Sequence, residues 1–116
     1  MIKFGERYYD EWLGEVNIIL LDDECECIGA VNCIEEDDEV YIAVLSFICG
    51  YREFRYFEEA VNIIKSMYPG KKLTGVAGPL GCYCGDPEDW EAVGAVTKPD
   101  PDDEIFTIFE LENKEA

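Results

Sequence analysis

Histidine is absent from this chain of 116 residues. Its absence excludes the usual Ser-His-Asp and Cys-His hydrolase sites, and a general base would have to be an aspartate or glutamate with a raised pKa. Basic residues are also scarce, with 9 lysines and arginines against 27 aspartates and glutamates. A formal net charge of -18 repels nucleic acid and anionic membranes, so we expect neither as a direct partner.

The sequence also lacks an export signal and long apolar runs. Residues 1–15 mix charged and aromatic side chains, and no run reaches the length of a membrane span. We therefore expect a soluble, cytoplasmic protein whose six cysteines are reduced. No Walker-type phosphate loop is present, and the acidic runs at residues 35–39 and 100–104 lack the spacing of a calcium loop.

What the chain does contain is enough apolar sequence, 48% of residues, to fill one core, and we expect a single domain over residues 1–116. Residues 1–14 are expected to form one or two helical turns. A hairpin follows, made of two strand-like runs at 16–21 and 27–34. Residues 40–49 are apolar at nearly every position, a pattern that predicts a central strand buried on both faces.

The hydrophobic period changes after Gly50. Apolar side chains recur at the spacing of one helix face from Phe57 to Tyr68, which predicts a long amphipathic helix ended by Pro69 and Gly70. A strand at 72–77, a short helix that begins near 86–89, a loop at 98–103 and a last strand at 105–111 complete the chain. The predicted order is β-β-β-α-β-α-β, an α+β fold whose strand-helix-strand crossover makes the sheet mixed.

This order resembles the GNAT acetyltransferase fold. The segment EEDDEVYIAVLSFICGYREFRYFEEAVNIIKSMYPGKKLTGVAG is similar to the family's strand, pyrophosphate loop, helix and following strand. A second match, DWEAVGA, is similar to its late aromatic-rich helix. The resemblance spans residues 16–111 and implies acetyl-CoA as cofactor, with the family's usual N-terminal strand and helices reduced to residues 1–14.

The positions that match the pyrophosphate loop depart from the family's pattern of Arg/Gln-x-x-Gly-x-Gly/Ala. They are Arg52, Glu53, Phe54, Arg55, Tyr56 and Phe57. Arg52 fits, whereas Arg55 replaces the first glycine and Phe57 replaces the closing small residue. Glycines matter at these positions because the pyrophosphate must reach backbone N–H groups at a helix N-terminus.

The late helix departs from the family as well. Where the resemblance implies a tyrosine that protonates the leaving thiolate, this chain has Trp90, whose indole N–H is not a useful acid. Tyr83 is the remaining candidate for that role.

Two Cys-x-Cys pairs, Cys25 with Cys27 and Cys82 with Cys84, would together satisfy a tetrahedral zinc. This spacing is less typical of structural zinc than C-x-x-C, so we favour reduced thiols without a metal, with Cys33 and Cys49 in the core. The aromatic residues Tyr8, Tyr9 and Trp12 are interpreted as the cover of a sheet edge, with a ligand-stacking platform as the alternative.

Charge separates one segment from the rest, because residues 48–73 carry five basic and three acidic side chains. The resemblance and the charge together lead to two hypotheses for the function. The first is a non-catalytic GNAT-like protein without a cofactor that binds a basic protein partner, as a phage or mobile-element factor would. The alternative is an acetyl-CoA-dependent N-acyltransferase for a basic protein or small acceptor, in which Arg52 and Arg55 hold the pyrophosphate by charge.

Overall fold

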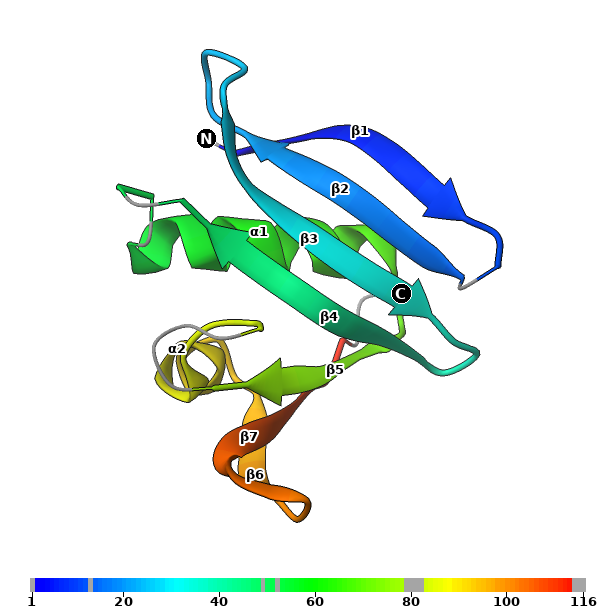
Figure 1. The fold of residues 1–116 in the computed structure, drawn as a ribbon, viewed down its shortest axis with the longest axis vertical. Helices are drawn as coiled ribbons and strands as arrows, with labels where there is room; N and C mark the ends of the chain where they lie inside the picture. Colours follow the sequence, from blue (N-terminus) through cyan, green and yellow to red (C-terminus); the bar gives the residue numbers. More distant parts are fainter. Residues whose placement is uncertain (1, 13, 49, 52, 79–82, 114–116) are drawn as a thin grey trace.

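The computed structural model describes residues 2–12, 14–48, 50–51, 53–78 and 83–113. Four strands come first, β1 (Lys3–Asp10), β2 (Glu15–Leu21), β3 (Cys27–Glu35) and β4 (Glu39–Phe47). They are followed by α1 (Phe54–Met67), β5 (Lys72–Ala77), α2 (Pro87–Ala92), β6 (Val96–Asp100) and β7 (Asp103–Leu111). All seven strands form one sheet in the order β1-β2-β3-β4-β5-β7-β6, a mixed α+β architecture as predicted (Figure 1).

Two strands were missed by the sequence prediction. Residues 1–14 were expected to be helical, but β1 pairs with β2 through contacts such as Tyr8 with Asn17. Residues 98–103 were expected to be a loop, but β6 pairs with β7 at the other edge of the sheet. Both are edge strands, and an edge strand buries so little that its sequence carries only a weak apolar alternation; β6 even accommodates Pro99, which cannot donate a ladder hydrogen bond.

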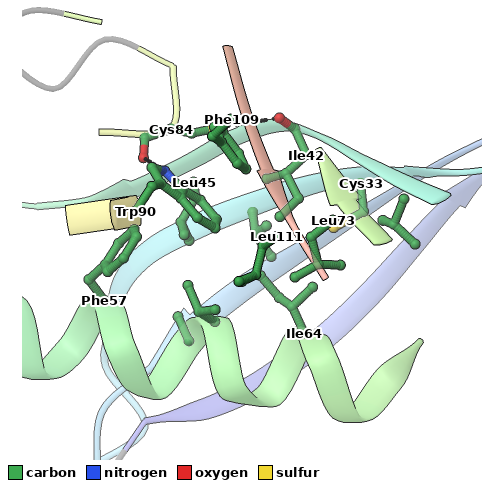
Figure 2. Packing of buried hydrophobic residues seen from close by; sticks show 14 of the residues in the cluster. Cys33, Ile42, Leu45, Phe57, Ile64, Leu73, Cys84, Trp90, Phe109 and Leu111 are labelled. Atoms are coloured by element: carbon green, nitrogen blue, oxygen red, sulfur yellow. Dashed lines mark hydrogen bonds between the residues drawn. The ribbon is translucent and has the colours of Figure 1, made fainter. Parts of the chain in front are cut away.

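One face of the sheet holds the core. From α1, buried side chains such as Phe57, Val61 and Ile64 point onto strands whose own buried residues include Ile42 and Leu73 (Figure 2). The helix period brings these positions to one side of α1, and the strand period of two brings alternate residues of each strand to meet them.

The opposite face is uncovered over β1 to β4. The helix α1 crosses behind β3 and β4 in Figure 1, and no described helix lies in front of β1 to β4. The strand β4 occupies the centre of the sheet, as expected, but it is not buried on both faces, because the side chain of Val44 is 37% exposed. The apolar run at residues 40–49 therefore overstates how completely this strand is covered.

The parallel pair formed by β4 and β5 separates partway along its length. Pairing runs from Glu39 opposite Lys72 to Ile42 opposite Gly75. Beyond this point the chain returns between the two strands, because Leu45 donates its N–H to the carbonyl of Tyr83 at 3.1 Å and Tyr83 also bridges to Ala77. The carboxyl ends of these strands are where an open α/β sheet normally receives a ligand.

Candidate functional site at the start of the first helix

The side chains at the N-terminus of α1 interact with one another. Arg55 is exposed, and its Nε lies 2.9 Å from a carboxylate oxygen of Glu53. Its Nη2 donates to the Tyr56 hydroxyl at 2.8 Å, and its guanidinium lies 4.7 Å from the centre of that ring. Glu53, at the N-cap, makes no capping bond with its side chain. The charge of Arg55 is thus directed to its own neighbours, while Arg52 lies outside the described residues.

Phe57 points away from this surface and into the core. Its side chain is 6% exposed and meets the ring of Trp90 edge-on, with 4.9 Å between ring centres. Trp90 in turn stacks on Phe109 with 3.8 Å between centres, so one residue from each of α1, α2 and β7 joins the aromatic stack (Figure 2). Residue 57 therefore supports the packing of both helices on the sheet.

A hollow of about 210 Å³ lies beside the start of α1. The turn that connects β2 and β3 contributes Asp22, Asp23 and Glu24, and Tyr51 and Tyr56 contribute two rings that lie 5.2 Å apart. Three acidic side chains around one hollow make it repulsive to an anion.

Asp22 accepts three hydrogen bonds through its carboxylate. Backbone N–H donation from Glu26, helped by the N–H of Glu24 and the hydroxyl of Tyr51, lowers the pKa of Asp22. The same hydrogen bond raises the pKa of Tyr51, because it stabilises the protonated phenol. Asp22 therefore carries its negative charge at neutral pH, next to the helix N-terminus.

Sequence reasoning missed Asp22 as part of this site. The sequence placed it only in the connection between the two strand-like runs at 16–21 and 27–34, although one signal was present. The strands β2 and β4 both run antiparallel to β3, so their carboxyl ends lie at the same end of the sheet, and this places the β2–β3 turn beside the start of α1.

The gap between β4 and β5 is occupied by the described residues Tyr83 and Cys84. Cys84 is fully buried and donates its thiol to the carbonyl of Ile42 at 3.0 Å. Together with the bond from Leu45 to Tyr83, this contact satisfies a donor and an acceptor of β4 that would otherwise face the gap. Burial raises the pKa of the Cys84 thiol to about 12, so it is protonated.

The two aromatic residues considered as catalytic acids have different environments. Trp90 is fully buried, and its indole N–H donates to the carbonyl of Cys84 at 2.9 Å. This N–H is therefore held in a structural hydrogen bond. Tyr83 is 53% exposed, has a backbone φ of 58° and packs its ring 5.2 Å from that of Phe106. Tyr83 is thus accessible, on the uncovered side of the sheet, whereas Phe57 and Trp90 fill the side below the helices.

The cysteines do not form the four-thiolate arrangement within the part of the chain that is described. Cys25 and Cys27 are exposed in the β2–β3 turn and at the start of β3, whereas Cys84 is buried between β4 and β5. Cys82 and Cys49 lie outside the described residues, and Cys33 is in the core as expected. Among the described side chains, no three of histidine, cysteine, aspartate or glutamate come together as metal ligands.

Comparison with known proteins defines the fold. No family model and no curated protein matches the sequence. Among solved structures, this chain is similar to a putative acetyltransferase of the GNAT family from Bacteroides thetaiotaomicron, with a TM-score of 0.59 and 12% sequence identity. The match covers 92% of this chain and 65% of the other, so this chain spans less than two thirds of that protein's length. The chain has a GNAT-like fold. Neither α1 nor α2 is long and apolar enough to cross a membrane.

The described residues at the start of α1 do not fit the pyrophosphate of acetyl-CoA. A pyrophosphate needs open backbone N–H groups and positive charge. Here Arg55 is paired with Glu53, and Asp22 holds a negative charge at the adjacent hollow. The gap between the carboxyl ends of β4 and β5, where an open sheet would receive a ligand, is occupied by Tyr83 and Cys84 of the chain itself.

Proposed function

We propose that this protein does not transfer acetyl groups and acts by binding a basic protein surface. The observation that carries the proposal is the pairing of Arg55 with Glu53 and Tyr56 at the N-terminus of α1. The positive charge that an anionic cofactor would need there is paired with the carboxylate of Glu53. The chain as a whole carries a charge of -18. Such a charge accelerates encounter with a positive surface.

The proposed action is that of an acidic, GNAT-derived binding factor of the kind phages and mobile elements encode. We place it in the cytoplasm, where the exposed thiols of Cys25 and Cys27 would stay reduced. Its partner is a basic protein or a small basic molecule, and neither nucleic acid nor a membrane surface.

Calorimetric titration tests this proposal with two probes. Acetyl-CoA is expected to give no heat of binding and no thermal stabilisation at millimolar concentration, whereas a lysine-rich helical peptide is expected to bind with an affinity that falls as salt rises. Tight binding of acetyl-CoA followed by acetylation of an amine would overturn the proposal.

The alternative function, an acetyl-CoA-dependent N-acyltransferase, is favoured by the five basic residues at positions 48–73 and by the exposure of Tyr83. In this case Arg52 and Arg55 would hold the pyrophosphate, and Arg55 would have to leave Glu53 to do so. Replacement of both arginines by alanine would then abolish stabilisation by acetyl-CoA, with Lys65→Ala on the same helix as the control.

A further inference from the structure

The uncovered face of the sheet contains a groove of about 310 Å³ over β1 to β4. A row of directly paired residues crosses it, namely Tyr8, Asn17, Asn32 and Val44. Ile19 and Ala30 line it on the next row. A sheet stabilises a domain by burying apolar side chains against a second layer, and here the second layer lies only on the other face.

The aromatic side chains of β1 and of the turn after it are exposed, contrary to the expectation that they cover a sheet edge. Tyr8 is 55% exposed within the groove, and Trp12, in the turn between β1 and β2, is 97% exposed. Tryptophan and tyrosine are the side chains that most often dominate binding energy at protein interfaces. The groove with Tyr8 offers an apolar contact surface of the kind that a partner protein buries.

Carboxylates follow the β1 side of the same face. Glu6 accepts the Tyr8 hydroxyl at 2.6 Å, and Glu15 accepts the side-chain amide of Asn32 at 3.2 Å. Asp10 is paired with Glu15 across the two strands, two residues along β1 from Tyr8, and so lies on the same face. A mainly apolar groove is thus bordered by acidic side chains.

The geometry restricts what can occupy the groove. Backbone hydrogen-bonding groups of a sheet point along its plane and not out of this face, and those between β1 and β4 pair neighbouring strands. A segment that lies on the face gains no backbone partners from the sheet, so it must satisfy its own, as a helix does. A second copy of this chain would bring another charge of -18 against the same carboxylates, which opposes self-association.

We propose that this groove binds an amphipathic helix of a basic partner protein. The helix places its apolar side chains on Ile19, Ala30 and Val44 and packs beside Tyr8, while its lysines and arginines face Glu6 and Glu15. This inference rests on the proposed function and specifies its surface.

The test uses synthetic peptides and the full chain. The probe is an 18-residue helix of leucine, lysine and alanine with its leucines along one side. A control of identical composition scatters the leucines around the helix, and a second control replaces every lysine by glutamate. We expect the amphipathic basic peptide to bind at least about tenfold more tightly than the scattered one, and the acidic one not to bind.

Variants of the protein locate the contact. Tyr8→Ala and Ala30→Gln alter exposed side chains, so the fold should persist, as circular dichroism will verify. Each is expected to weaken binding at least about tenfold, because a truncated interface tyrosine or an obstructed groove removes central contacts. The matched control is Val96→Gln, which changes an exposed apolar residue at the opposite edge of the sheet and is expected to leave affinity unchanged.

Each outcome decides a different point. If both basic peptides bind equally and the two groove variants behave as the parent, the groove inference is wrong while binding to basic partners stands. If no basic peptide binds, the proposed function fails as well. If sedimentation shows a dimer that Ala30→Gln disrupts, the face joins two copies of the chain and the helical partner is excluded.

Discussion

Replacement of Phe57 by alanine distinguishes a core residue from a cofactor-loop residue. The parent side chain is 6% exposed and contacts Trp90 edge-on, inside a stack that continues to Phe109. Truncation of a buried phenylalanine costs about 3–5 kcal/mol, since transfer free energy is lost and a cavity remains. Alanine is also the better helix former, so any gain in helix propensity acts in the opposite direction. We expect a net loss of about 3 kcal/mol or more, a large share of the roughly 5–15 kcal/mol of a typical domain.

Urea unfolding followed by circular dichroism measures this loss. The control is Glu58→Ala, which changes an exposed neighbour on the same helix and should shift stability by no more than about 0.5 kcal/mol. The reasoning would be refuted if Phe57→Ala lost less than about 1 kcal/mol, within the usual range of surface changes. It would also be refuted if the variant gained stabilisation by acetyl-CoA, because a smaller residue at position 57 would then have opened a cofactor site.

Three further predictions concern stability and thiol reactivity. Gly75→Ala should destabilise the fold by about 1–3 kcal/mol in urea, because its new Cβ would lie 2.5 Å from Cζ of Phe109. Asn113→Ala should cost about 1–2 kcal/mol by the same assay, since its side-chain amide donates to two carbonyls at the C-terminal end of α1. Burial raises the pKa of Cys33 and of Cys84 to about 12, so their thiols should resist alkylation at pH 8 in the folded protein and become accessible in urea.

The same thiols predict how stability depends on alkaline pH. Their folded pKa values lie above the ordinary value of 9.0, so the unfolded chain releases protons first as pH rises. The stabilisation is complete below pH 9 and is lost between about pH 9 and 12, which a series of urea midpoints will show. An unchanged midpoint across this interval would contradict the assignment, as would alkylation of Cys84 as fast as that of exposed Cys27 in the native state.

Control variants for Gly75→Ala and Asn113→Ala are available at or beside the same positions. Thr74→Ala alters the residue before Gly75 on the opposite face of β5 and should cost less than Gly75→Ala. For Asn113, the change to aspartate retains the shape of the side chain but removes both donated bonds, so it should destabilise at least as much as alanine. If Asn113→Asp were as stable as the parent, the helix-end contacts would not contribute.

Sequence reasoning identified α1, β2 to β5 and β7 because each has a strong apolar period, and a period reports which side of one element is buried. It missed β1 and β6, whose edge positions bury little. It predicted that Arg55 and Phe57 lie at the start of a helix, but it did not predict the direction in which either side chain points. Arg55 turns to Glu53, and Phe57 turns to Trp90.

The sequence by itself determined the composition, the charge of -18 and the local periods that define the central elements. Only the tertiary structure decided that Tyr83 and Cys84 lie between β4 and β5, and that Asp22 lies beside the start of α1. It also decided that a groove over β1 to β4 is left without a second layer. The physical reason is that these contacts join segments far apart in the chain, and their meeting depends on strand order and register rather than on any local pattern.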